Sequence, residues 1–192
     1  MGERARRDTR IGPAIDRSLI DRARNGDLNA FESILRARMD AVYRLTNAIL
    51  GNEADARDAA QETFVAAWRQ LPRLREPEKF EAWLQRVAVN AARQVHRARS
   101  RRRIREIPSS TVVALAELAA GAERDDAAIL DSALATLPIE QRAILVLHHL
   151  EGRSVAELAA ILEIPIGTAK SRLFTARQAL AAVIAADEGR DR

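Results

Sequence analysis

The chain has 192 residues, no cysteine and a formal net charge of +4. The lack of cysteine excludes disulfide bonds, thiolate catalysis and cysteine-based zinc sites. No apolar run approaches the roughly 20 residues that span a membrane, and residues 1–10 have no apolar core that could serve as a secretory signal. We therefore expect a cytoplasmic protein that does not insert into a membrane itself.

The two halves of the chain differ in charge. Residues 1–105 contain 23 Arg or Lys against 14 Asp or Glu, whereas residues 106–192 contain 8 against 13. Such asymmetry indicates two separate units and a polyanionic partner for the first. The high hydrophobic and low aromatic content, 47% and 4%, is typical of compact helical bundles.

Residues 1–17 are polar and arginine-rich, which predicts a mobile basic arm. Gly51 and Asn52 interrupt the helical pattern that follows, and a loop with a proline at each end, 72–77, interrupts it again. The expected helices are 18–26, 28–50, 54–71 and 79–103. Apolar residues at helical spacing, expected to be buried, include Phe31, Leu35, Val42, Leu45, Ile49, Phe64, Phe80, Trp83, Leu84 and Val87.

Residues 106–124 predict a linker, since Pro108 and small polar residues break the helix there. The helical pattern resumes at residue 125, with helices expected to end at Pro138 and near Gly152, and a polar tail follows at 187–192. The chain shows no strand pattern. The expected fold is all-α, with helical domains at 18–105 and 125–186 joined by a flexible linker.

Residues 154–177 predict a helix-turn-helix, with two short helices joined by a tight turn. Ser154 and Glu157 have the spacing of a capping box, and Pro165 suits the turn and the start of the second helix. In that helix Ile166, Ala169, Leu173, Ala176 and Leu180 share the inward face, while Thr168, Ser171, Phe174, Thr175 and Gln178 lie opposite, flanked by Lys170 and Arg172. Small polar residues bordered by cations suit a DNA groove, although a helical hairpin with a solvated outer face has the same pattern.

The helix 79–103 carries the strongest electrostatic signal. No acidic residue occurs between Ala82 and Arg105, and the cations are Arg86, Arg93, Arg97, Arg99, Arg101, Arg102, Arg103 and Arg105. Such a run favours contact with phosphates; a basic helix end that frays into the linker is the alternative. Trp68 and Trp83 flank the loop 72–77, where they could stack on bases, but their spacing favours the core and leaves the loop to hold a flipped base.

Two further groups of polar residues have simple interpretations. Asp55, Asp58, Gln61 and Glu62 form a mainly acidic face that, from the residues alone, is a solvated helix surface. His148 and His149 are adjacent, point in different directions and lack partners at metal-ligand spacing. We therefore expect no metal site, no cofactor and no catalytic residue, and the chain is not expected to be an enzyme.

Four segments in order resemble the bacterial extracytoplasmic-function (ECF) sigma factors of the sigma-70 family. They are DARDAAQETFVAAWRQL (55–71), FEAWLQRVAVNAAR (80–93), LATLPIEQRAILVLHHLEGRS (134–154) and IPIGTAKSRL (164–173). The resemblance covers residues 16–182 except for the linker. It implies that the domains 18–105 and 125–186 are sigma regions 2 and 4.

The resemblance also implies partners and site residues. Core RNA polymerase, through its clamp helices and its flap, promoter DNA and an anti-sigma factor are the implied partners. The residues implied to bind polymerase are Asp55, Asp58, Gln61 and Glu62. Those for the downstream promoter element are Arg73, Arg75, Lys79, Arg86, Asn90, Arg93 and Arg97. Those for the upstream element are Arg142, Thr168, Lys170, Ser171, Arg172, Phe174 and Arg177.

The function implied is that of an alternative sigma factor, which directs polymerase to promoters and aids strand opening. The main alternative is an autonomous helix-turn-helix regulator, which would bind duplex DNA without polymerase, usually as a symmetric dimer. That alternative leaves the arginine run and the acidic face without a role. An RNA-binding or enzyme-associated helical adaptor would explain the cations but not the recognition helix.

Overall fold

The computed structural model describes residues 15–106 and 126–188. Most of the predicted arm, linker and tail lies outside the described residues. Within these two ranges every regular element is a helix or a short 3-10 turn, as the all-α prediction requires. No helix in them is both long and apolar enough to cross a membrane.

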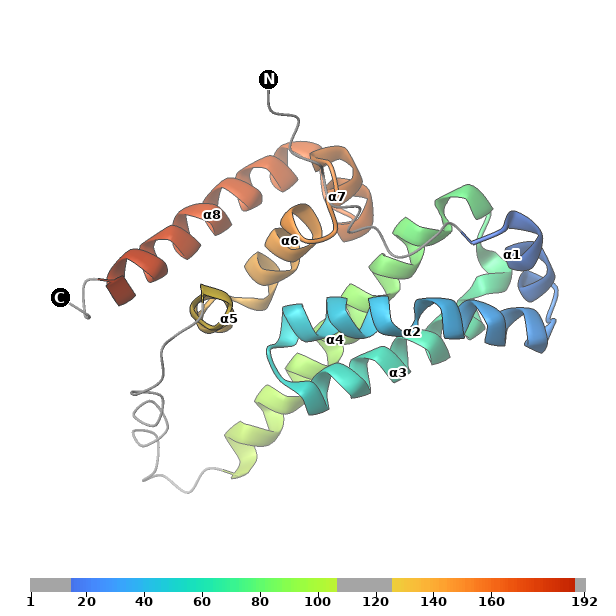
Figure 1. The fold of residues 1–192 in the computed structure, drawn as a ribbon, viewed down its shortest axis with the longest axis horizontal. Helices are drawn as coiled ribbons and strands as arrows, with labels where there is room; N and C mark the ends of the chain where they lie inside the picture. Colours follow the sequence, from blue (N-terminus) through green and yellow to red (C-terminus); the bar gives the residue numbers. More distant parts are fainter. Residues whose placement is uncertain (1–14, 107–125, 189–192) are drawn as a thin grey trace.

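The first unit is a bundle of four helices (Figure 1). The long helices α2, α3 and α4 pack against one another, and α1 packs on α2 and on the turns that connect α3 to α4. The elements are α1 (Arg17–Arg24), α2 (Leu28–Leu50), α3 (Glu53–Gln70), η1 (Leu71–Arg73), η2 (Pro77–Lys79) and α4 (Phe80–Glu106). The 3-10 turns η1 and η2 occupy the predicted loop.

Local sequence signals set the boundary between α2 and α3. Gly51 ends α2 in the left-handed conformation with φ 64°, where a residue without a Cβ carries no steric penalty. Asn52 begins α3, because its side chain accepts a hydrogen bond from the Asp55 amide at 3.0 Å. The prediction that these two residues interrupt the helix is confirmed.

A buried ion pair joins α2 to the start of α4. Arg38 is only 1% exposed, and its Nε donates to Oε1 and Oε2 of Glu81 at 3.0 and 3.1 Å while its Nη2 donates to Oε1 at 2.5 Å. A buried guanidinium needs such a partner, because an uncompensated buried charge is strongly destabilising. The pair therefore fixes the first turn of α4 against the middle of α2.

Replacing Glu81→Ala should lower the free energy of unfolding by about 3 kcal/mol, because Arg38 would stay buried without this carboxylate. Urea denaturation followed by circular dichroism measures the loss. Glu32→Ala is the matched control, since its partner Arg36 is exposed and the change should stay within about 1 kcal/mol. Equal losses in the two variants would mean that the buried pair has no special role.

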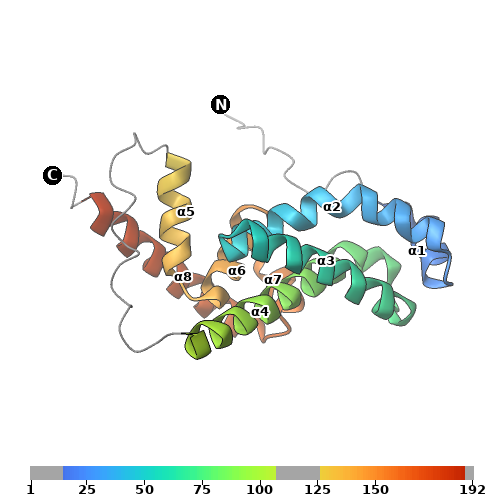
Figure 2. The ribbon, with the colours of Figure 1, turned by 90° about the horizontal axis from the view of Figure 1, so that it is seen from below.

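The second unit, the helix-turn-helix unit, is built around its last helix. α8 packs against α5, α6 and α7, and Figure 2 shows it from below, with α5 beside its C-terminal half. The elements are α5 (Asp126–Thr136), α6 (Ile139–His149), α7 (Val155–Leu162) and α8 (Ile166–Glu188). α8 is 23 residues long rather than short, since the alanine-rich sequence after Arg177 continues to favour a helix.

The capping box predicted at Ser154 is present. The Ser154 amide donates to Oε2 of Glu157 at 2.8 Å, and the Glu157 amide donates to Oγ of Ser154 at 3.3 Å. Burial works to raise the pKa of Glu157, but the hydrogen bonds from Ser154 and Arg153 prevail and lower it. The carboxylate therefore stays charged at the helix N-terminus, where the dipole favours it.

The turn between α7 and α8 lies where the sequence predicts it. α7 ends at Leu162, and Glu163 caps it in the left-handed conformation, with φ 55°. Ile166, expected to face inward, is instead 52% exposed, at the first position of α8. Ala169, Leu173 and Ala176 are buried as predicted.

Replacing Ser154→Ala should destabilise the chain by about 1 kcal/mol, because the Glu157 amide loses its acceptor. A shift of the urea midpoint at constant slope measures the effect. The control is Ser33→Ala, in the second turn of α2, where the hydroxyl donates to the Asn29 carbonyl. A Ser154→Ala midpoint equal to that of the control would contradict the cap.

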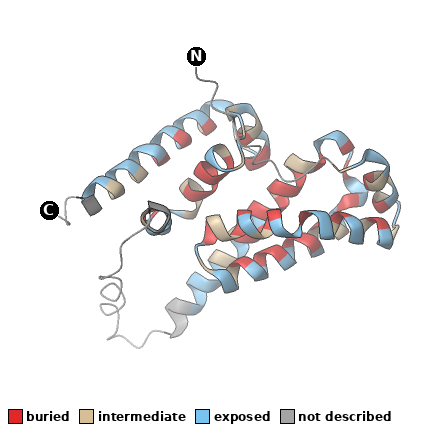
Figure 3. Ribbon diagram, viewed as in Figure 1, coloured by how far each residue is buried: buried red, intermediate tan, exposed pale blue. Residues whose placement is uncertain are grey.

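The two units are docked. α4 packs against α6 and α7, and α2 packs against α6. Buried residues of both units form one hydrophobic cluster, and Figure 3 shows them on the inward sides of both units. One side of α4 therefore has the helix-turn-helix unit as a neighbour.

Candidate nucleic-acid and protein interfaces

The outward face of α8 is exposed and basic. Phe174 is 61% exposed, and Lys170, Ser171, Arg172 and Arg177 are also exposed, whereas Thr168 is half-buried. Arg177 donates from its Nε to Nε2 of His149 at 3.3 Å. The upstream-element residues predicted on this helix are therefore open to solvent, Thr168 in part.

Arg142, the remaining upstream-element residue, lies elsewhere. It is only 6% exposed, and it donates to the carbonyl oxygens of Leu137 at 3.1 Å and Leu50 at 3.2 Å. Burial lowers the pKa of Arg142. The expectation that this side chain faces DNA is not met in the docked arrangement, because Leu50, in α2 of the other unit, is a partner that local spacing does not reveal.

The arginines of α4 face different surroundings. Arg86 pairs with Glu163 at 2.9 Å and Arg93 with Glu140 at 2.5 Å, both acidic residues of the helix-turn-helix unit. Arg93 also donates to Oδ1 of Asn90 at 3.1 Å. Among the arginines of the run whose exposure the structure describes, Arg97, Arg99, Arg101 and Arg102 are exposed. The predicted basic surface is present, but three of its cations have carboxylate partners, because Arg99 also pairs with Asp55 of α3.

The cations of the loop line a cavity of about 380 Å³, which we call the loop cavity. Its walls from the first unit include Arg73, Arg75, Lys79, Trp83 and Arg86. Ala160 and Ile161 of α7 line it from the second unit. The hydrogen bond from Lys79 to Glu76 raises the pKa of Lys79. The Trp83 ring is 8% exposed and lies 5.7 Å from the Phe80 ring. Its predicted place in the core is confirmed, and one side of it borders the cavity.

The four residues predicted to bind polymerase do not share one surface. Asp58, Gln61 and Glu62 are exposed on α3, and we call them the acidic ridge. Asp55 turns instead toward α4, where its carboxylate pairs with Arg99. The ridge therefore consists of three residues, and Asp55 supports the contact between α3 and α4.

An apolar groove of about 960 Å³ runs beside the acidic ridge, between α2 and α3. Its lining includes Leu28, Phe31, Leu35, Met39, Phe64 and Trp68. Leu28 is 66% and Met39 40% exposed, and the Phe31 and Trp68 rings lie 4.9 Å apart. Phe31, Leu35 and Trp68, predicted to be buried, are half-buried walls of this groove, and Phe31 and Leu35 pack against the core from there.

The histidines form a small cluster without carboxylates. The His148 and His149 rings meet edge to face at 4.8 Å, and burial, then His148 and Arg177, lower the pKa of His149. Among residues 15–106 and 126–188, no group of three His, Cys, Asp or Glu side chains could hold a metal ion.

Matches to models of known protein families show which family this chain belongs to. The model of sigma-70 region 2 matches residues 34–102, and the model of sigma-70 region 4 matches residues 127–180. The chain belongs to the sigma-70 family. The sigma region 2 match contains most of the groove, the ridge and the loop cavity, and the region 4 match contains the helix-turn-helix.

Curated relatives place the chain among the ECF sigma factors. It is 33% identical over 180 residues to the ECF sigma-E factor of Escherichia coli K12, covering 86% of this chain and 92% of the relative. It is 32% identical over 180 residues to the sigma-H factor of Pseudomonas aeruginosa, covering 86% of this chain and 91% of that relative. These lengths mean that the similarity extends through both sigma regions.

Two solved structures have a similar fold. CnrH in complex with the cytosolic domain of CnrY matches with a TM-score of 0.63 and 27% identity, covering 90% of this chain and 98% of that one. The sigma factor RpoE in complex with the anti-sigma factor NepR from Bartonella quintana matches with a TM-score of 0.64 and 26% identity. That match covers 83% of this chain and 99% of the other. Both are structures of complexes with a second protein, and the second is of a sigma factor with an anti-sigma factor.

Proposed function

We propose that this chain is a dissociable specificity subunit of RNA polymerase that directs initiation at promoters with separate upstream (−35) and downstream (−10) elements. One observation carries the proposal: a chain of the sigma-70 family presents an exposed recognition helix in one unit and a cation-lined cavity in the other. Polymerase carries out the chemistry of RNA synthesis, and this chain is not itself an enzyme.

The upstream element is bound by the exposed face of α8. Lys170 and Arg177 contact phosphates, while Ser171, Arg172 and Phe174 face the base edges, where a guanidinium discriminates best and an aromatic ring contacts a thymine methyl. Thr168, near the start of the helix, lies beside the DNA backbone. Arg142 joins this set only if the units separate, because α2 holds it in the docked form.

The downstream element is bound at α4 and the loop before it. Arg73, Arg75 and Lys79 surround the loop cavity, which offers cations for the backbone and the Trp83 ring for an unpaired base, a combination suited to a melted single strand. Arg86, Asn90, Arg93 and Arg97 extend this surface along α4. Promoter melting then follows from capture of one strand.

Core polymerase binds the first unit at the acidic ridge and the apolar groove together. A helical partner with an apolar stripe and basic flanks, such as the clamp helices, fits this combination of a groove and carboxylates. The helix-turn-helix unit binds the flap. An anti-sigma factor would regulate the chain by covering these surfaces, in line with the partner-bound states of the similar structures.

Reconstitution with core RNA polymerase tests the proposal as a whole. We expect the chain to elute with the core enzyme in gel filtration and to support start-site-specific run-off transcription from the promoter of its own gene. If it fails to bind the core but binds duplex DNA tightly alone, the autonomous regulator is the correct function.

Replacing both Asp58→Arg and Glu62→Arg should weaken binding to core polymerase by about 100-fold, because like charges would then oppose the basic partner. The thermal unfolding curve should not change, since both side chains are exposed. The control pair Glu32→Arg and Glu53→Arg changes the net charge equally, at exposed carboxylates in intrahelical pairs. Retained binding in the ridge variant would remove the ridge from the interface.

Replacing Arg172→Ala should lower run-off transcription by at least about 10-fold, because one good contact to a base edge contributes 1–3 kcal/mol. Binding to the core should stay within about 2-fold, because the side chain is exposed on the DNA-facing side. Gln178→Ala, on the same exposed side further along α8, is the control. Parallel loss of transcription and core binding would show that Arg172 supports the fold instead.

A further inference from the structure

The C-terminal end of α6 meets α8 at two histidines and one arginine. His149 and Arg177 are both exposed, and Nε of Arg177 donates to Nε2 of His149 at 3.3 Å. The His148 ring lies edge to face against the His149 ring, with 4.8 Å between the centroids. We call these three residues the histidine cluster. Because a guanidinium can only donate, Nε2 of a neutral His149 is unprotonated and its Nδ1 carries the proton.

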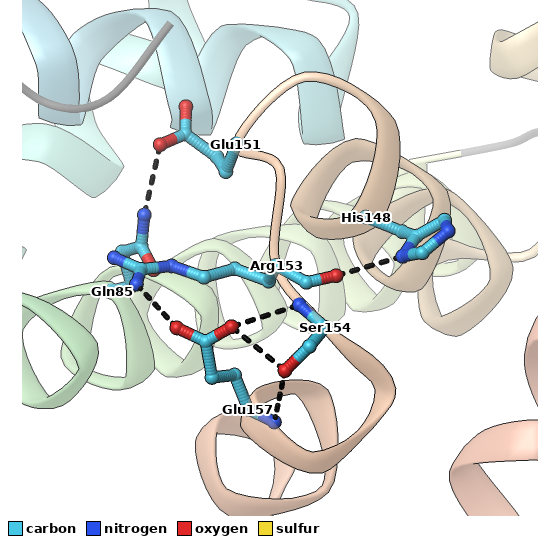
Figure 4. A network of polar contacts seen from close by, with 6 residues as sticks. All are labelled: Gln85, His148, Glu151, Arg153, Ser154 and Glu157. Atoms are coloured by element: carbon cyan, nitrogen blue, oxygen red, sulfur yellow. Dashed lines mark hydrogen bonds and ion pairs between the residues drawn. The ribbon is translucent and has the colours of Figure 1, made fainter. Parts of the chain in front are cut away.

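His148 is oriented by the turn that follows α6 (Figure 4). Its Nδ1 donates to the carbonyl oxygen of Arg153 at 2.7 Å. The Arg153 side chain points elsewhere, since its Nε donates to Oε1 of Gln85 at 2.7 Å and its Nη1 donates to Oε1 of Glu157 at 2.8 Å. Gln85, 1% exposed, donates in turn to Oε2 of Glu151 at 2.8 Å. These charged side chains are thus directed toward one another and toward α4.

The histidine cluster borders the face of α8 proposed to bind the upstream element. Lys170, Phe174 and Arg177 follow one another at spacings of four and three residues, so they form one stripe along the helix. The hydrogen bond to Arg177 places the His149 ring beside the end of this stripe. A DNA backbone that reaches Arg177 therefore also passes the His149 ring.

The free chain disfavours a positive charge on His149. Partial burial, then the neighbouring His148 and Arg177, lower the pKa of His149, so its ring is neutral at neutral pH. The polar contacts of α6 with α2 and α4, at Arg142 and Glu140, lie near the other end of the helix. A proton on Nε2 would also replace the acceptor of Arg177 with a second donor.

A phosphate reverses this preference. An anion beside the imidazole favours its charged form and raises its pKa, and phosphate oxygens accept from a guanidinium and an imidazolium at the same time. The two donors that would face each other without a partner in the free chain would then share one acceptor group. Arg177 and His149 are close enough for this, because they are already in hydrogen-bond contact.

We propose that His149 and Arg177 together hold one phosphate of the upstream element, and that the imidazole takes up a proton from solvent when DNA binds. In the free chain Arg177 donates to the neutral ring, whereas in the complex both side chains donate to the phosphate. Since the complex holds the proton more tightly, the affinity for duplex DNA rises as the pH falls from the pKa of the complex to that of the free chain. The inference rests on the proposed function in one respect, that α8 binds duplex DNA.

The test measures DNA binding as a function of pH. The probe is a fluorescent duplex with the promoter of the chain's own gene, offered to the full chain alone and to the chain reconstituted with core polymerase. Anisotropy at constant ionic strength gives the affinity. We expect the unmodified chain to bind about 5- to 10-fold more tightly at about pH 5.5 than at about pH 8, the gain that uptake of a single proton allows.

Two variants and one control separate the charge from the contact. His149→Gln keeps an acceptor for Arg177 but does not titrate, so it should bind at every pH as the unmodified chain does at about pH 8. His149→Lys, charged throughout, should bind at about pH 8 as tightly as the unmodified chain does at about pH 5.5. The control His96→Gln removes a histidine of α4 whose pKa is also lowered by burial, and it should leave the pH dependence unchanged.

Equal pH dependence of the unmodified chain and His149→Gln would overturn the proposal, and so would an absence of binding to the duplex both with and without core polymerase. Proton NMR adds a second test, since the chain has three histidines and the resonance lost in His149→Gln identifies the ring. The pKa of this ring should rise when the duplex is added. An unchanged pKa in the presence of bound DNA would also contradict the shared phosphate.

These outcomes are distinguishable from failure of the proposed function. A chain that binds the duplex with the expected pH dependence, but does not bind core polymerase, would keep the phosphate contact of His149 and lose the sigma activity. A chain that supports specific transcription while His149→Gln responds to pH like the His96→Gln control would keep the sigma activity and lose the proton uptake.

Discussion

The buried amide of Gln85 determines how the two halves of this protein meet. An amide enclosed without partners costs about 1–3 kcal/mol, so α4 can be covered there only where Glu151 and Arg153 are both in place. Burial raises the pKa of Glu151, since Arg153 and Gln85 offset only part of the hydration that its carboxylate loses. This docking also brings Arg86 and Arg93 to their carboxylate partners in the helix-turn-helix unit, since residues seven apart on a helix share a face.

The two functional surfaces of the first unit differ in access. The apolar groove is lined by residues of α2 and α3 alone, and the acidic ridge beside it is exposed, so a helical protein partner can bind while the units stay docked. The loop cavity instead has α7 along one side. This difference favours an order of events in which the protein partner binds first and the DNA strand afterwards.

Features that depend on neighbours in sequence could be predicted, and those that depend on tertiary packing could not. The capping box of Ser154 and Glu157 and the buried side of α8 follow from spacing along one helix. The burial of Arg142 could not be predicted, because one of its acceptors, the Leu50 carbonyl, lies 92 residues away. Phe31 and Leu35 lie at the spacing of a buried face, yet nothing in the sequence shows that the packing of α2 on α3 leaves this part of α2 open as a groove.

The length of α8 has a consequence of its own. At 1.5 Å per residue, its 23 residues form a rod about 34 Å long, with the recognition residues near one end and α5 packed beside the other half (Figure 2). Because a continuous helix rotates as one body, any change in the angle at which the exposed end of α8 meets a partner also moves α5, which packs on α8.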